Sequence, residues 1–320
     1  MVDTSNEPHI AHKSHLPHPY DQDISHVLRH LSRITATGRK KLANSLSTAG
    51  YLAAGMWLIE RNLGPDAARS ACASGSRRSL ERPLLGFLSQ RAVAAAVAEN
   101  PPPFPSRGGV PRLRTTWRSQ SDFIADLINF AMWPTNYHPG YLEQRAVTTK
   151  RLVVGEDFVR AVHETAYLHT AESVRMPSVR LSLALMVLAD GDDRVQRVLT
   201  DTYRGYLSSW KQVYAEVLRA RGLRLRAGLG LDDLANALSA ATDGVILRSI
   251  GDPHAGVVDR GRERTLMGTV ALAVMHGFLE PAEDSDGLTL EQAVHARLGR
   301  PRPSGAARSD ALRGERNPNP

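Results

Sequence analysis

Apolar residues recur every three or four positions along most of the chain, which is the spacing of one face of an α-helix. No alternation of apolar and polar residues bounded by turn signals occurs, so we expect no β-strand. The pattern therefore predicts an all-α protein. It predicts helices over residues 42–60, 123–132, 158–168, 179–189, 193–220, 231–250 and 263–279.

Capping residues and prolines predict two further, short helices. Ser89 is placed to cap a helix on the apolar side of residues 88–97, and the prolines of 101–109 exclude helix directly after it. A second short helix fits between this proline-rich turn and Ser119, which with Asp122 has the spacing of a capping box. We therefore expect two short helices joined by a long turn and followed by a longer helix.

The two ends of the chain lack the helical period. Residues 1–38 are rich in histidine, proline and polar side chains, and residues 283–320 hold one short helical pattern before a Pro/Arg/Gly-rich end. Segments with so little apolar surface gain too little from burial to offset the entropy of ordering. We expect a disordered tail at 1–38 and a mostly mobile tail at 283–320. The prolines also keep the N-terminal histidines off one helix face, so we expect no metal site.

The net charge of +7 is concentrated in the N-terminal third of the chain. Residues 39–118 contain 13 Lys/Arg and four Asp/Glu, so the remainder is close to neutral. A concentrated basic surface is typical of proteins that bind the phosphate backbone of nucleic acids. A solvated basic face without such a function has the same composition, so the charge favours DNA binding without deciding it.

The sequence offers little for catalysis, metal binding or membrane insertion. The single cysteine, Cys72, excludes an internal disulfide and any multi-cysteine metal site. His163-Glu164 begins like a zinc-protease motif, but Tyr167 stands where the second histidine is required. No run of about 18 apolar residues occurs. We therefore expect a cytoplasmic protein that is not an enzyme, takes no cofactor and contacts no membrane.

Two segments resemble the TetR family of transcriptional regulators, in the order that family uses. LSQRAVAAAV at 88–97 resembles the first helix of the family's helix-turn-helix. RLRTTWRSQSDF at 112–123 resembles the family's signature, with Leu113, Trp117 and Ser119 at its leucine, aromatic and serine positions. The turn between the two segments is longer than is usual in the family.

The second similar segment lies near the end of the chain. Residues 222–279 carry a leucine/alanine stripe, Asp243-Gly244 and Arg248, followed by a helix of small and aliphatic residues, and resemble the family's C-terminal helical pair. The resemblance implies a helix-turn-helix DNA-binding domain over 39–130. It also implies a helical ligand-binding and dimerisation domain over 131–282.

Another alignment places the helix-turn-helix earlier, in LIERNLGPDAARSACASGSRRS at 58–79, with LSQRAVAAAV continuing after it. That alternative leaves some fifty residues before Trp133 without an assignment, and we keep it open.

By the resemblance, the second helix of the motif enters the major groove of DNA and contacts base edges from its first residues. Arginine can bind guanine in a bidentate fork, and threonine offers hydroxyl or methyl contacts. Trp117 is expected to anchor this helix in the core. The implied DNA-binding residues are Ser89, Arg107, Arg112, Arg114, Thr115, Thr116 and Arg118.

The central helices are dense in aromatic and imidazole groups, which suits a planar or amphipathic ligand. From this set, which also includes His169 and Tyr214, we assign ligand binding to His163, Tyr167, Tyr203, Tyr206 and Trp210. The apolar stripes of 231–250 and 263–279 fit a four-helix bundle with a second copy, although packing inside one subunit explains them as well. The expected dimerisation residues are Leu234, Leu238, Val245, Leu266, Val270 and Val274.

Together these features predict a TetR-like regulator, usually a repressor, that binds palindromic double-stranded DNA as a homodimer. An unknown small-molecule effector would release it from its operator in the nucleoid. The alternative is an all-α dimeric small-molecule-binding protein that has lost DNA binding.

Overall fold

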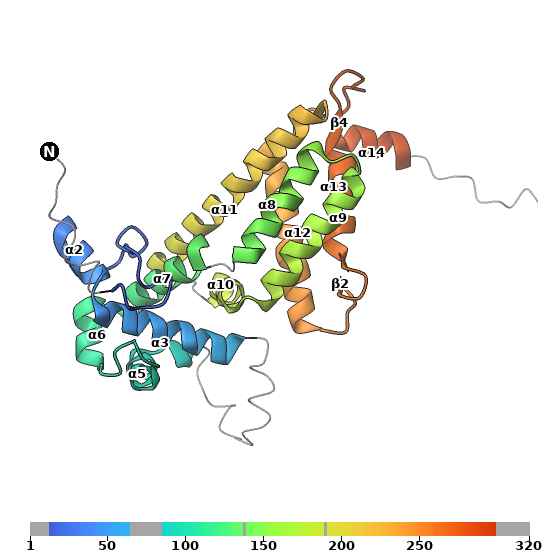
Figure 1. Cartoon of the computed structure of the whole chain (residues 1–320). Coiled ribbons are helices and arrows are strands. Elements are labelled where there is room, and N and C mark those ends of the chain that lie inside the picture. Colours follow the sequence, from blue (N-terminus) through green and yellow to red (C-terminus); the bar gives the residue numbers. More distant parts are fainter. Residues whose placement is uncertain (1–12, 65–84, 137–138, 189–190, 299–320) are drawn as a thin grey trace, which may run out of the picture.

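Figure 1 shows the computed structural model, which describes residues 13–64, 85–136, 139–188 and 191–298. The helices before residue 137 form one group at the lower left, and most of the later helices form a second group beside it. Each group surrounds a hydrophobic core of its own, and side chains from 181–199 also enter the first core. The expected all-α class is confirmed.

The first group contains short helices around one long one. Its elements are α2 (Ala36–Ala43), α3 (Leu46–Leu63), a 3₁₀ turn (Gly86–Leu88), α5 (Gln90–Ala96) with a 3₁₀ extension (Val97–Glu99), α6 (Val110–Thr116) and α7 (Gln120–Ala131). The expected caps are confirmed: Ser89 Oγ accepts the N–H of Ala92, and Ser119 and Asp122 exchange both hydrogen bonds of a capping box. The expected helix over 42–60 begins later, at the cap Ser45, and α2 precedes it.

The second group is built from longer helices. Its elements are a 3₁₀ turn (Pro134–Asn136), α8 (Pro139–Val154), α9 (Phe158–Arg175), α10 (Pro177–Leu188), α11 (Asp193–Ala220), β1 (Leu223–Leu225), α12 (Leu231–Gly251), β2 (Val258–Asp259), β3 (Arg264–Thr265), α13 (Leu266–Phe278), β4 (Leu279–Pro281) and α14 (Leu290–Leu298). Helix α8 was not expected. Tyr141 and Leu152 are its buried hydrophobic side chains, so its apolar period is weak.

The expectation of no strands is wrong. Strand β1 pairs antiparallel with β4, with Leu223 opposite Pro281, and β2 pairs antiparallel with β3. Each strand is two or three residues long. Such strands are too short to produce a recognisable alternation of apolar and polar residues.

The N-terminal residues 13–35 are ordered, which corrects the expected disordered tail at 1–38; residues 1–12 lie outside the described part. Ile24, Val27 and Leu28 are buried in the first core. The buried carboxylate of Asp126 on α7 accepts backbone N–H groups from Arg29 at 2.7 Å and His30 at 3.0 Å. The segment has few apolar residues, but α3 and α7 provide a surface on which they are buried.

A second network fixes the start of this segment to the junction of α2 and α3. Lys13, with 1% of its surface exposed, donates to the carbonyl of Gln22 at 3.0 Å and to Asn44 Oδ1 at 3.3 Å. Asn44 in turn donates to Asp23 at 2.7 Å. Burial lowers the pKa of Lys13 to about 8, although Asp23 and Asp21 oppose this change.

The proline-rich turn between α5 and α6 packs against α3. The hydroxyl of Tyr51 donates to the carbonyl of Gly109 at 2.9 Å and accepts the N–H of the same residue at 3.0 Å. Asn100 donates to the carbonyl of Gly50 at 2.9 Å. The Phe104 ring meets the Tyr20 ring edge to face at 4.8 Å. The long turn is therefore held at both ends and in the middle.

The expected mobile tail at 283–320 also begins with ordered residues. Asp286 forms an ion pair with Arg226 at 2.8 Å, and α14 follows. Residues 299–320 lie outside the described part, as do Cys72 and most of the earlier alternative helix-turn-helix at 58–79.

Candidate functional site

The expected recognition helix, α6, lies at the edge of the first group beside α3 and α5, and α7 follows it along the chain (Figure 1). Leu113 and Trp117 on its inner side are fully buried. The Trp117 ring meets Phe123 edge to face at 5.1 Å, and its Nε1 donates to Asp126 at 2.9 Å. Trp117 is therefore a core anchor, as expected.

The outer side of α6 is polar and basic. Arg112, Arg114 and Thr115 are exposed, and Arg114 Nε donates to Gln90 on α5 at 3.0 Å. Thr116 differs from the expectation: only 2% of its surface is exposed, and its hydroxyl donates to the carbonyl of Arg112. It lies on the same side of the helix as Leu113, so we withdraw it as a DNA-contacting residue.

An open hollow of about 470 Å³ lies where α5, α6 and α7 meet. It brings together three of the expected DNA-binding residues, Ser89, Arg114 and Arg118. Arg91 was missed by the sequence analysis, although it follows the cap of α5 within the basic region. The hollow is lined by Ser89, Gln90, Arg91, Val110, Arg114, Arg118, Ser119 and Gln120.

This hollow has the chemistry of an anion site. Arg91, Arg114 and Arg118 are exposed at its edge, and Ser119 marks the N-terminus of α7. The positive end of a helix dipole and arginine side chains both favour a phosphate group. Arg107, also expected at the interface, is exposed near the end of the proline-rich turn.

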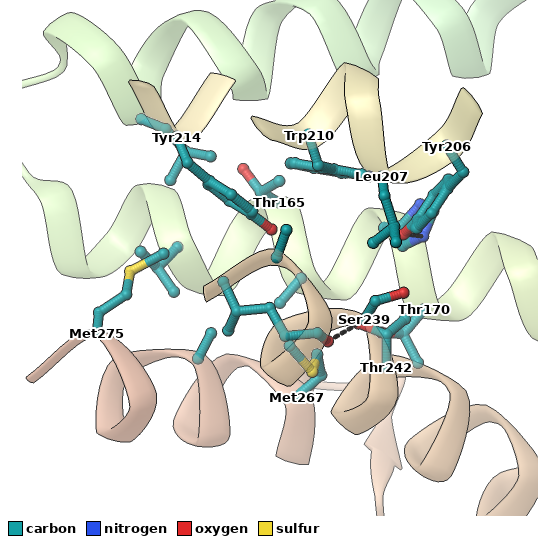
Figure 2. A pocket seen from close by; sticks show the side chains of 17 residues that line it. Thr165, Thr170, Tyr206, Leu207, Trp210, Tyr214, Ser239, Thr242, Met267 and Met275 are labelled. Atoms are coloured by element: carbon teal, nitrogen blue, oxygen red, sulfur yellow. Dashed lines mark hydrogen bonds between the residues drawn. The ribbon is translucent and has the colours of Figure 1, made fainter. Parts of the chain in front are cut away.

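A small cavity of about 60 Å³ lies inside the second group of helices, between α9, α11, α12 and α13 (Figure 2). Trp210 and Tyr214 of α11 stack at 5.7 Å on one side of it, and Met267 and Met275 lie opposite. Three of its buried polar atoms, Thr165 Oγ1, Thr170 Oγ1 and Trp210 Nε1, have no hydrogen-bond partner among the described residues. A volume of this size holds a few water molecules or part of a ligand.

His169 links this cavity to a larger one. Its Nε2 lies 2.8 Å from the hydroxyl of Tyr206, and its Nδ1 lies 3.0 Å from the hydroxyl of Tyr141. Burial, together with the positive charge of Arg145, lowers the pKa of His169 to about 4. The imidazole is therefore neutral near pH 7, so it donates to one tyrosine and accepts from the other.

The larger cavity has a volume of about 480 Å³ and lies between the two groups of helices. His26, Arg29 and Trp133 line it from the N-terminal side. Tyr203 and Asp243 line it from the other side, where the tyrosine hydroxyl donates to the carboxylate at 2.6 Å. Burial, with this hydrogen bond, raises the pKa of Tyr203 to about 12. The volume falls within the range of about 300–1,000 Å³ typical of small-molecule sites.

Three of the five expected ligand residues line these cavities. Tyr203 lines the larger one, Trp210 the smaller one and Tyr206 both. His163 and Tyr167 line neither, because they lie on a different face of α9 from His169; His163 packs against Gly268 of α13. The density of aromatic and imidazole residues in the sequence therefore did not indicate which of these side chains line a cavity.

Half of the expected dimerisation residues are core residues of one subunit. Leu234, Leu238 and Val245 are 1%, 3% and 6% exposed and belong to the second hydrophobic core. They pack inward because their side of α12 faces α9 and α13, which corrects that part of the prediction. On α13, Leu266 is 47% exposed, and Val270 and Val274 are partly buried.

The geometry defines an all-α protein in which a group of short helices with basic, exposed side chains on α6 precedes a group of longer helices that encloses a cavity. Comparison with family models places residues 160–276 in the family described as "BetI-type transcriptional repressor, C-terminal", a TetR-type domain. The match begins in α9 and ends in α13, so it includes the helices around the small cavity. Residues 160–276 are therefore similar to the C-terminal domain of TetR-type transcriptional repressors. No curated protein and no solved structure matched the chain.

The described residues contain neither a membrane-spanning helix nor a cluster of metal-ligating side chains. None of their helices combines the length and the apolar character needed to cross a membrane. The same residues contain no cluster of three or more His, Cys, Asp or Glu side chains arranged to hold a metal ion.

Proposed function

We propose that the protein is a one-component repressor of the TetR type, which binds a palindromic operator as a homodimer and leaves it when a small molecule binds. The observation that carries this proposal is the difference between the two sides of α6. Leu113 and Trp117 fix one side of the helix in the core, while Arg112, Arg114 and Thr115 are exposed on the other. A helix held in this way can present its polar side to the major groove.

Different residues would contact the DNA bases and the DNA phosphates. Arg112 and Arg114 are the candidates for base edges, because they stand on the exposed side of α6. Arg91, Arg107 and Arg118 surround that helix and would contact phosphates, which set the orientation on DNA. Ser89 and Ser119 support this arrangement as helix caps.

Effector control is supported by the way α11 joins the two groups of helices. Tyr203, Tyr206 and Trp210 of α11 line the cavities. At the start of the same helix, Asp192 is hydrogen-bonded to Ser121 of α7. A ligand that displaces α11 would therefore displace the start of α7, directly after the recognition helix, and change the spacing of the two DNA-binding helices in a dimer.

The outer sides of α12 and α13 are the proposed dimer interface. They carry small and aliphatic side chains that allow close helix packing, with partly buried positions beside exposed ones. A two-fold axis there would pair α12 and α13 with their copies. The exposed or partly buried residues of this surface are Ala237, Ala240, Gly244, Leu247, Leu266, Thr269, Val270, Ala273 and Val274.

The experiment that tests the function is selection of bound duplexes from genomic DNA. The affinity for the most enriched sequence is then measured as a function of salt concentration. We expect an enriched palindrome whose half-sites lie about one helical turn, ~34 Å, apart or a multiple of that. Arg112→Ala and Arg114→Ala should each weaken specific binding by about 1–3 kcal/mol. Absence of any enriched sequence and of salt-dependent binding would contradict the proposal.

Ligand-binding and DNA-binding measurements on the same protein distinguish the proposed function from the alternative. An all-α small-molecule-binding protein that has lost DNA binding would bind ligand in the 480 Å³ cavity and show no affinity for duplex DNA. As a DNA-bound regulator, the protein would act in the cytoplasm at the nucleoid, without catalysis.

A further inference from the structure

Ser32 ties the N-terminal segment to the end of the recognition helix. Its N–H donates to the carbonyl of Thr116 at 2.9 Å, and its hydroxyl donates to the carbonyl of Thr115 at 2.5 Å. The guanidinium of Arg118 donates back to the carbonyl of Ser32 at 3.0 Å. The two bonds from Ser32 use carbonyls at the end of α6 that have no partner within the helix. Ser32 therefore holds a fixed position relative to the exposed side of α6.

The segment after Ser32 carries exposed basic side chains. Arg33 is exposed, and Thr35 caps α2 by accepting the N–H of Gly38 at 3.2 Å. A Cβ at Gly38 would lie 3.5 Å from Cβ of Arg33, so the Arg33 side chain begins beside the first turn of α2. Lys41 stands three residues after Gly38 and therefore on the same side of the helix.

Two kinds of basic residue can be distinguished on α2 and directly before it. Lys40 faces Asp23 at 3.4 Å and is partly buried by that contact. Arg33, Arg39 and Lys41 are exposed, and none of them forms an ion pair or a side-chain hydrogen bond with the described residues. We call these three residues the N-terminal basic patch.

We propose that the N-terminal basic patch binds the phosphate backbone of the DNA that flanks the bases contacted by α6. The inference rests on the proposed DNA-binding function and extends its interface beyond the helix-turn-helix. Duplex DNA presents a phosphate charge on both sides of each groove, so a surface fixed beside an inserted helix meets the adjacent backbone. The bonds of Ser32 to α6 and of Asp126 to Arg29 and His30 provide that fixation.

The patch contributes charge that is already in place when DNA arrives. A mobile basic tail would pay an ordering cost on binding, whereas Ile24, Val27, Leu28 and Leu31, directly before the patch, are buried in the first core. Each lysine or arginine that neutralises a phosphate releases condensed counterions, and this release makes affinity depend on salt. The patch should therefore affect affinity for every duplex, without changing which sequence is preferred.

The test is the salt dependence of DNA binding by the full chain with the double substitution Arg33→Ala/Lys41→Ala. The slope of log affinity against log salt should fall by about 0.9 for each phosphate that the variant no longer neutralises. Binding to the selected operator and to an unrelated duplex should weaken by a similar factor, about tenfold or more at ~0.1 M salt. Circular dichroism and thermal unfolding establish that the variant is folded.

Two controls separate a local effect from net charge and from folding. Arg219→Ala/Arg260→Ala removes the same charge from exposed positions in the other domain and should leave the slope unchanged. Arg33→Lys/Lys41→Arg keeps the charge and should keep the slope. An unchanged slope in Arg33→Ala/Lys41→Ala, with specific binding weakened in Arg112→Ala, overturns this inference alone. Failure of the unsubstituted protein to bind any duplex overturns the proposed function together with it.

Discussion

Arg194 in the first turn of α11 forms an ion pair with Asp122 in the first turn of α7. Asp122 is also half of the capping box that begins α7, whose cap Ser119 lies three residues after the end of α6, the proposed recognition helix. The helix that carries the cavity aromatics and the helix behind the proposed DNA-binding surface are thus joined at their N-termini.

The first prediction concerns this junction. Arg194→Ala should lower the free energy of unfolding by about 1 kcal/mol, because Asp122 keeps its capping bonds and the arginine is half exposed. The substitution should increase the rate of amide hydrogen exchange in the first turn of α7 and leave the rate in α3 unchanged. Arg197→Ala, one turn along α11 and exposed, is the control and should change neither quantity. Equal exchange in Arg194→Ala and the unsubstituted protein would mean that the pair does not hold the junction.

The second prediction concerns the pH dependence of stability. Burial raises the pKa of Asp126 to about 6, although hydrogen bonds from Trp117, His30 and Arg29 oppose this change. The folded protein therefore binds a proton here more readily than the unfolded chain between pH ~4 and ~6, so this group's contribution to stability increases as pH falls through that window.

Urea unfolding of the unsubstituted protein and of Asp126→Asn at pH 7 and pH 4.5 measures this effect. The unsubstituted protein should gain stability relative to the variant by an amount on the order of 2 kcal/mol on acidification. A stability difference that is the same at both pH values would show that Asp126 does not titrate in this range.

The third prediction concerns Tyr51, which holds the turn before α6. Tyr51→Phe should lower the free energy of unfolding by about 1–3 kcal/mol, because the N–H and carbonyl of Gly109 both lose their hydroxyl partner. It should also weaken DNA binding, since α6 begins directly after Gly109. Tyr214→Phe is the matched control and should affect neither stability by this amount nor DNA affinity. A neutral Tyr51→Phe in both assays would contradict the anchoring role.

The fourth prediction concerns the small cavity. Thr170 is fully buried and its hydroxyl has no partner among the described residues, so Thr170→Val should leave stability unchanged or raise it by about 1 kcal/mol. Thr242 lines the same cavity, but its hydroxyl donates to the carbonyl of Leu238 at 2.8 Å. Thr242→Val should therefore be the more destabilising of the two in thermal unfolding. The reverse order would indicate that Thr170 has a bound partner, such as water.

The sequence by itself determined the elements with strong local causes. The helical period predicted the long helices, and serine caps predicted the starts of α5 and α7, because both depend on residues within a few positions of one another. Trp117 was also recognised as an anchor, since a large aromatic residue between two helices gains most by burial.

Tertiary structure decided what depends on distant partners. Residues 13–35 look disordered as a sequence, yet Asp126, 97 positions beyond Arg29, supplies the hydrogen bonds that fix them. The face of α9 that carries His169 and the side of α12 that is buried were set by neighbouring helices. An apolar period gives the direction of burial only when a single side of the helix is apolar. Helices α9 and α12 carry side chains that can be buried on more than one side.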